Sequence, residues 1–118
     1  FARSLDLVAE CGLTHLHVFP YSPRPGTPAA RMPQVAPEIV RDRASRLRAA
    51  GEAALVRHLD GEIGAVRRVL TERGGIGRTE GFTLAALDAG KPGEIVEADI
   101  SGHDGARLIA APLAARAA

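Results

Sequence analysis

The chain has 118 residues, of which 46% are hydrophobic and 25% are charged, and its formal net charge is +1. This is the composition of one ordinary globular domain or of parts of two, and so small a net charge indicates no strong preference for a partner. No run approaches the roughly 18 apolar residues of a membrane-spanning helix and no apolar signal segment opens the chain, so we expect a cytoplasmic location and no membrane partner.

Cys11 is the only cysteine in the sequence. It has no partner for an internal disulfide, which fits a reducing compartment. An iron–sulfur cluster needs three or four thiolates, so this chain cannot hold one by itself. Because Phe1 is not a natural start, we expect the chain to be a fragment or a processed piece of a longer protein.

The first predicted elements are a helix end over residues 2–11 and a strand over Thr14–Phe19. Gly12 between them suits a left-handed helix cap. His15 and His17 fall on one face of the predicted strand because strand side chains alternate. A metal site would need a third ligand, and the remaining histidines lie far along the chain, so a structural role is favoured for both.

A proline-rich loop follows this strand. Prolines occupy four of the nine positions from 20 to 28, and each fixes its own backbone and forces the residue before it to be extended. The loop therefore holds its polar side chains at low entropic cost, and in β/α barrels the loops after strands bind ligands. These side chains are Tyr21, Ser22, Arg24 and Thr27. The alternative interpretations are a plain linker and, for Arg24, a salt bridge that pins the loop.

A long helix is predicted from Pro37, which suits the first helical position, to about Leu59. Gly51 weakens it midway, by about 1 kcal/mol relative to alanine. The arginines on its other faces indicate a solvated surface, with RNA contact as the alternative. They are Arg41, Arg43, Arg46 and Arg48.

From Ile63 onward the hydrophobic period changes from 3.6 to 2, and glycine-rich turns separate most of five short runs. Short, evenly spaced strands of this kind predict a small closed or partly open β-barrel. Gly77 and Gly81 mark expected bends or bulges, and residues 112–118 are expected to form a tail. The predicted strands are Ile63–Glu72, Ile76–Gly81, Phe82–Leu87, Glu94–Ile100 and Arg107–Ala111.

The proline-rich loop also carries the pattern Phe-x-Tyr-Ser-x-Arg-x-Gly-Thr-x-Ala. This pattern resembles the end of the catalytic barrel of the radical SAM methylthiotransferases. The matching residues are Phe19, Tyr21, Ser22, Arg24, Gly26, Thr27 and Ala29. The segment His-Val-Phe-Pro-Tyr-Ser over residues 17–22 most resembles the corresponding segment of one branch of these enzymes, which modifies threonylcarbamoyladenosine in tRNA.

The second half resembles a TRAM domain, an OB-like RNA-binding barrel found at the C-terminus of these enzymes. The matching segments are 69–72, 77–82 and 93–96. The resemblance implies an α+β chain. Residues 1–60 would be the C-terminal end of a radical SAM β/α barrel, ordered helix–strand–loop–helix, and residues 61–118 would be a five-stranded antiparallel OB-like barrel.

The resemblance further implies a parent enzyme that adds a methylthio group to C2 of the adenosine just 3′ of the tRNA anticodon, using S-adenosylmethionine and two [4Fe–4S] clusters. The loop residues Tyr21, Ser22, Arg24 and Thr27 would then face S-adenosylmethionine or substrate. The cluster motif C-x3-C-x2-C is absent, so this chain is expected to bind no cofactor and to be inactive alone. The alternatives are the branch that modifies an aspartate of a ribosomal protein, and a stand-alone RNA-binding module.

For the TRAM-like half, four arginines near the first turn are the candidate contacts to tRNA in the anticodon region: Arg67, Arg68, Arg73 and Arg78. Residues 61–118 carry seven basic and eight acidic side chains, so binding would depend on local clustering of these arginines. Phe82 is the single aromatic residue there, which predicts poor base stacking. The alternative is a structural lid on the catalytic barrel.

Overall fold

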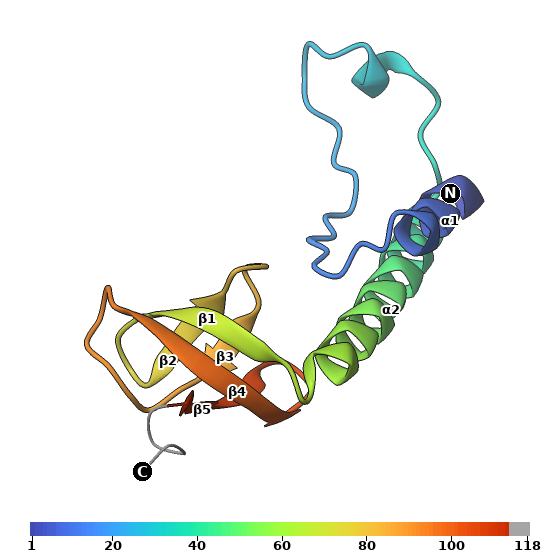
Figure 1. The fold of residues 1–118 in the computed structure, drawn as a ribbon. Coiled ribbons are helices and arrows are strands. Elements are labelled where there is room, and N and C mark those ends of the chain that lie inside the picture. Colours follow the sequence, from blue (N-terminus) through green and yellow to red (C-terminus); the bar gives the residue numbers. More distant parts are fainter. Residues whose placement is uncertain (114–118) are drawn as a thin grey trace. The chain divides into compact units, whose positions relative to one another are not determined.

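The structure, a computed structural model, describes residues 1–113. Two α-helices precede five strands that close into a barrel, which confirms the predicted α+β class (Figure 1). The chain divides into two compact units, one formed by residues 1–54 and one that begins at Leu55. No helix among the described residues is both long and apolar enough to cross a membrane.

The first unit begins with α1 (Ala2–Glu10), which ends as predicted. Gly12 adopts φ +63°, the left-handed conformation that glycine accepts without strain. The N–H of Leu13 donates to the carbonyl of Val8 at 3.1 Å, and the N–H of Gly12 donates to that of Ala9 at 3.3 Å. These two bonds are those of a Schellman motif, and they satisfy two of the carbonyls that the helix end leaves free.

The predicted strand over Thr14–Phe19 is wrong, because no residue of this segment is in a strand. A strand needs a neighbour to accept its backbone hydrogen bonds, and residues 1–113 provide none here. The segment is nevertheless extended, with Leu16 and Val18 half-buried and the alternate residues exposed. Arg48 Nη2 donates to the carbonyl of Val18 at 3.4 Å.

A short 3₁₀ turn, η1 (Ala29–Arg31), and the helix α2 (Pro37–Glu62) follow. The predicted helix is confirmed from its first residue and extends three residues beyond Leu59. A Cβ on Gly51 would lie 2.9 Å from Leu16 Cδ1. The glycine inside α2 therefore gives room for the extended segment to pack against the helix.

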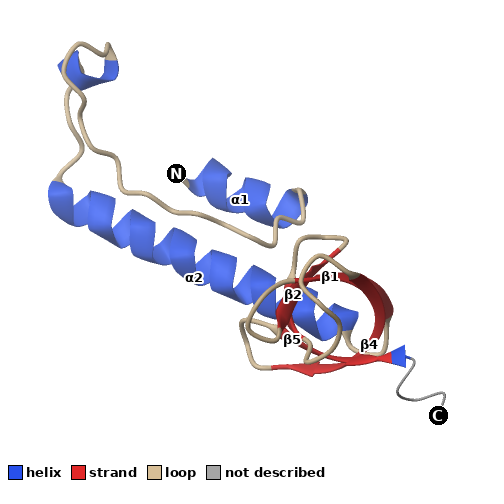
Figure 2. Cartoon of the chain, turned by 90° about the vertical axis from the view of Figure 1, so that its left-hand side faces the viewer, coloured by secondary structure: helices blue, strands red, loops and turns tan. Residues whose placement is uncertain are grey.

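The second unit contains all five predicted strands, of which the first three are shorter than predicted, the fourth is longer and the fifth is shifted by one residue. They are β1 (Val66–Thr71), β2 (Ile76–Thr79), β3 (Leu84–Ala86), β4 (Ile95–His103) and β5 (Leu108–Pro112). The strands close into a ring in the order β1-β2-β3-β5-β4, and Figure 2 shows the sheet curving around. Pro112 belongs to β5, and the rest of the predicted tail lies, from residue 114 on, outside the described residues.

One pair of strands corrects the expectation of a wholly antiparallel barrel, because β3 and β5 run parallel. The other four pairs are antiparallel. Strand direction alternates around a ring of antiparallel pairs, so a closed ring with an odd number of strands must contain at least one parallel pair. Closure of a five-stranded barrel thus requires the exception.

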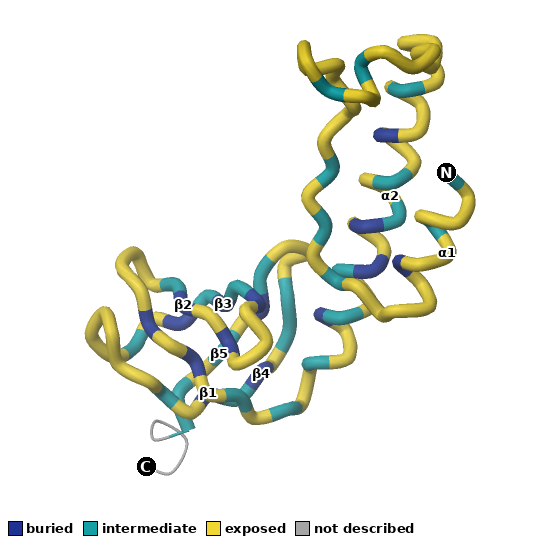
Figure 3. Tube along the Cα trace, turned by 90° about the horizontal axis from the view of Figure 1, so that it is seen from above, coloured by how far each residue is buried: buried dark blue, intermediate teal, exposed yellow. Residues whose placement is uncertain are grey.

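The barrel interior holds the buried core, in which the inward residues of the strands alternate with half-buried or exposed ones (Figure 3). Leu59 from α2 is fully buried in this core, so the helix end fills one part of the barrel. The other members are Val69, Ala85, Leu87, Ala98, Ile100 and Leu108.

Candidate functional site

The proline-rich loop is organised by a tight turn over residues 24–27. Thr27 N–H donates to the carbonyl of Arg24 at 3.3 Å, Pro25 holds the second position, and Gly26 adopts φ +85° at the third. This is the arrangement of a type II turn. Thr27 Oγ1 also donates to the carbonyl of Arg24 at 2.8 Å and accepts from the N–H of Ala30 at 3.3 Å. The Thr27 hydroxyl is therefore engaged within the loop itself.

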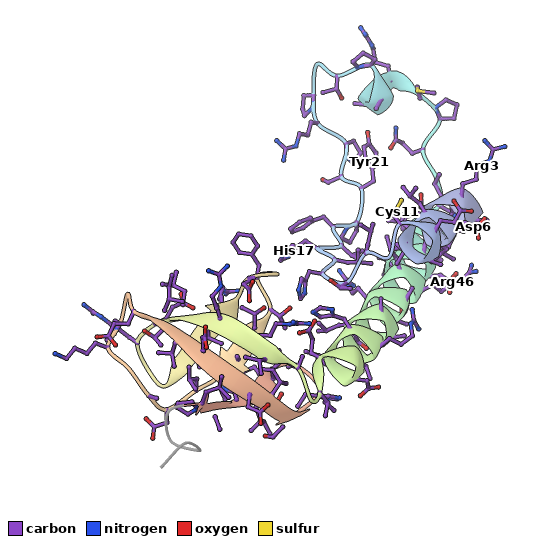
Figure 4. The ribbon with its side chains drawn as sticks, viewed as in Figure 1. Arg3, Asp6, Cys11, His17, Tyr21 and Arg46 are labelled. Carbon is purple, nitrogen blue, oxygen red and sulfur yellow. The ribbon has the colours of Figure 1, made fainter. Side chains whose placement is uncertain are left out.

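The other three predicted loop residues are exposed. Among residues 1–113 no acidic side chain pairs with Arg24, so the salt bridge considered for it has no partner there. Its guanidinium group is open to an external carboxylate or phosphate. Ser22 is likewise exposed. Tyr21, labelled in Figure 4, lies on the segment that leads to η1.

Tyr21 lines an open, largely apolar groove of about 260 Å³ in the first unit. Phe1 and Phe19 line the same groove, and Phe19 is 85% exposed. The guanidinium groups of Arg43 and Arg46 lie over the Phe1 ring, 5.4 and 5.0 Å from its centroid. Two of the four arginines of the predicted solvated face therefore make cation–π contacts with Phe1.

The four candidate RNA-binding arginines lie in different surroundings. Arg67 Nε is 2.5 Å from Glu62 Oε2 at the end of α2. This hydrogen bond, and then the charge of Glu62, raises the pKa of Arg67 above its ordinary value. Arg73 lies in the β1–β2 turn and has no ion pair among the described residues. Only Arg68 and Arg78 share one surface.

That surface is a shallow groove of about 190 Å³ on the outside of the barrel, which we call the outer groove. It is lined by Arg68, Leu70, Arg78, Thr79, Glu80 and Ile95. Strand register builds it, because Leu70 of β1 is paired with Arg78 of β2 on one side and with Ile95 of β4 on the other. Leu70 is 47% and Ile95 65% exposed, so the groove has an aliphatic floor between its two guanidinium groups.

Each arginine of the outer groove has a glutamate partner. Arg68 Nη2 lies 3.5 Å from Glu80 Oε2, and the backbone N–H of Arg68 donates to Glu80 Oε1 at 2.9 Å. Chiefly because of this backbone hydrogen bond, the pKa of Glu80 lies below its ordinary value. Arg78 Nε lies 3.6 Å from Glu72 Oε2. Such exposed pairs contribute little to stability, so a phosphate group could replace either carboxylate.

Sequence reasoning missed the glutamate partners and the aliphatic floor. Leu70 follows the buried Val69 and precedes the buried Thr71, so its position in the two-residue period already places it outside the barrel. The pairing of Glu80 with Arg68 depends on the β1–β2 register, which the sequence did not specify.

The described residues offer no place for an iron–sulfur cluster. In residues 1–113 no group of three or more His, Cys, Asp or Glu side chains could hold a metal ion. Cys11 is exposed and provides a single thiolate. The donor set of this chain therefore does not fit such a cluster.

No family model matches the chain, but curated proteins do. Over 103 residues, 86% of its length, the chain is 42% identical to the threonylcarbamoyladenosine tRNA methylthiotransferase MtaB of Rickettsia prowazekii. It is 40% identical over 103 residues, again 86%, to the tRNA-2-methylthio-N(6)-dimethylallyladenosine synthase of Sorangium cellulosum. A protein with the latter name from Zymomonas mobilis is 45% identical over 76 residues, 64% of the chain. The chain spans only 24%, 21% and 17% of the lengths of these three relatives.

Proposed function

Because the chain is homologous to the C-terminal region of radical SAM tRNA methylthiotransferases, we propose that it is the C-terminal part of such an enzyme. The parent enzyme would add a methylthio group to C2 of the modified adenosine just 3′ of the anticodon. The observation that carries this proposal is the 42% identity to the Rickettsia relative over 86% of the chain. The His-Val-Phe-Pro-Tyr-Ser segment favours threonylcarbamoyladenosine as the substrate, whereas the names of the other two relatives favour dimethylallyladenosine.

In this proposal the two halves of the chain have different roles. Residues 1–60 complete the catalytic barrel, and the exposed Tyr21, Ser22 and Arg24 face S-adenosylmethionine or substrate there, on a loop that Thr27 stabilises. Two [4Fe–4S] clusters would supply the radical and sulfur chemistry. Their cysteines must come from residues that this chain does not contain, because it has one cysteine.

Residues 61–118 form the TRAM domain in this proposal and contribute tRNA binding through the outer groove. Arg68 and Arg78 contact phosphates, which position the RNA but carry little sequence information. The exposed, exchangeable ion pairs of both arginines support this role. Arg73, in the β1–β2 turn, makes a third phosphate contact in this proposal. Arg67 contributes indirectly, because it is occupied by Glu62.

The activity is tested in cells that carry the gene of the parent protein. Mass spectrometry of digested tRNA should show that a disruption removes the methylthio group from one modified adenosine and that the intact gene restores it. The nucleoside that loses the group identifies the branch. Unchanged tRNA together with loss of a methylthio group from a ribosomal protein would instead support the aspartate-modifying branch.

The RNA-binding role is tested by titrating the full chain with an anticodon stem–loop at several salt concentrations. With about three phosphates neutralised, log K should fall against log salt with a slope of roughly −2. Replacement of Arg68 and Arg78 by alanine should flatten the slope by about 1.4, whereas Arg57→Ala on α2 should leave it unchanged. Undetectable binding at low salt, or an unchanged slope in the double variant, would favour the structural lid.

A further inference from the structure

Phe82 in the β2–β3 loop is an exposed aromatic residue in a strained backbone conformation. Its φ is +62°, and it is the one non-glycine residue with positive φ among residues 1–113. Its side chain is 75% exposed, so the described part of the chain leaves most of the ring uncovered. Strain of this kind persists where the surrounding structure holds it, and it is concentrated at functional sites.

Hydrogen bonds fix this conformation. Phe82 N–H donates to the carbonyl of Thr79 at 2.9 Å, and Thr79 N–H donates to the carbonyl of Thr83 at 2.9 Å. Thr83 N–H also donates to Thr79 Oγ1 at 3.3 Å. Three residues thus lie between the hydrogen-bonded Thr79 and Thr83, and Phe82 occupies the left-handed last position that glycine ordinarily takes in such loops. The loop therefore holds the ring on a rigid base outside the barrel.

The backbone of Phe82 is hydrogen-bonded to a residue of the outer groove. Arg78, which lines that groove, donates through Nη1 to the carbonyl of Phe82 at 3.3 Å. Glu80, the partner of Arg68, belongs to the same loop. The loop that exposes the Phe82 ring is therefore bonded to one arginine of the outer groove and supplies the glutamate partner of the other.

We propose that Phe82 stacks on an unpaired base of the RNA whose phosphates the outer groove contacts. This inference rests on the proposed RNA-binding function. An exposed ring on a loop that joins a groove with two guanidinium groups suits a nucleotide, which offers a π face and a phosphate, better than a protein surface, which needs continuous apolar area. One aromatic residue is sufficient for one base, and stacking tolerates any base because each has a π face.

The test uses the full chain and two fluorescein-labelled oligonucleotides of about ten nucleotides, a single-stranded RNA and its abasic counterpart. Phe82→Gly should weaken RNA binding roughly 5- to 150-fold and should leave binding of the abasic strand unchanged. Because no charge is removed, the slope of log K against log salt should stay that of the wild type. Glycine also relieves the left-handed strain, so the variant should melt no lower than the wild type, which separates weaker binding from unfolding.

Phe82→Trp provides a direct readout because the chain has no other tryptophan. This variant should keep RNA affinity, and its fluorescence should be quenched by RNA but not by the abasic strand. If the wild type binds no RNA, the proposed RNA-binding function fails. If the wild type binds RNA and Phe82→Gly binds equally well, the stacking inference alone fails, and a protein surface remains as the partner of the ring.

Discussion

Replacing Gly77 with alanine should destabilise the barrel strongly. Gly77 is buried in β2, opposite Thr71 of β1. A Cβ at this position would lie 2.5 Å from Val69 Cγ1 and 2.6 Å from the carbonyl oxygen of Leu70. The Val69 side chain has limited room to rotate, and the Leu70 oxygen belongs to the backbone of the paired strand. The new methyl group therefore forces β1 and β2 apart.

The loss of unfolding free energy in Gly77→Ala is the difference between two opposing effects. An extra methyl group in a packed core costs about 1–3 kcal/mol, and two contacts well below van der Waals distance place this site near the upper limit. Alanine also restricts the unfolded chain, which offsets about 0.4–1 kcal/mol. The net loss is about 2 kcal/mol, which corresponds to a decrease of roughly 8–16 °C in Tm for a domain of this size.

Thermal unfolding of the full chain, followed by circular dichroism, measures this change. Gly102→Ala is the matched control, because Gly102 also belongs to a barrel strand and a Cβ there would meet no atom within 4 Å. The control should melt within a few degrees of the wild type. If Gly77→Ala melts as the wild type does, or if both variants lose stability equally, the close approach of β1 and β2 at Gly77 is wrong.

Three further predictions follow from the barrel and its outer groove. Leu59→Ala should cost about 2–5 kcal/mol in chemical unfolding because the side chain is fully buried, whereas Val56→Ala, at a residue 39% exposed, should cost much less. Combined Glu72→Gln and Glu80→Gln substitutions should strengthen binding to the anticodon stem–loop several-fold, because Arg68 and Arg78 lose the carboxylates that compete with phosphate. Unchanged affinity in that titration would show that the ion pairs do not compete with phosphate. The pKa of Glu80 in the folded chain lies below its ordinary value of 4.5. The ionised carboxylate therefore stabilises the fold above pH 4.5, and this stabilisation is lost as the pH falls through the lower pKa of the folded state. Melting curves should therefore show a difference between the wild type and Glu80→Gln at neutral pH that disappears in strong acid, and a difference independent of pH would contradict the assignment.

Local chemistry made much of the fold predictable. The left-handed Gly12, the start of α2 at Pro37 and the existence of five strands follow from turn residues, helix-start preferences and hydrophobic period. Each of these signals acts within a few residues of the position that it determines. The barrel itself was predictable because short strands with glycine-rich turns cannot bury their apolar faces unless the sheet curves closed.

Features that depend on distant residues were not predictable. The strand expected over Thr14–Phe19 has the correct alternation but lacks a pairing partner within residues 1–113. The reason for Gly51 appears only when Leu16 packs against it. The four arginines were predicted to form one patch because they are close in sequence. Side chains of a β-strand alternate between its two faces, however, so Arg67 points toward Glu62 and Arg68 toward the outer groove.

The end of α2 shows that a change of hydrophobic period marks where the helix gives way to strands. It does not mark which residues pack in the barrel. The hydrophobic period changes at Ile63, and the predicted domain boundary follows residue 60. Yet three residues in the last turns of α2 contact the barrel through polar groups. His58 Nε2 lies 2.7 Å from Thr83 Oγ1, Asp60 Oδ1 lies 2.5 Å from His103 Nε2, and Glu62 pairs with Arg67. Leu59, between two of them, is part of the barrel core. A barrel that began at residue 61 would lose this side chain and expose the apolar positions that it covers, so the last turns of α2 are structurally an element of the barrel.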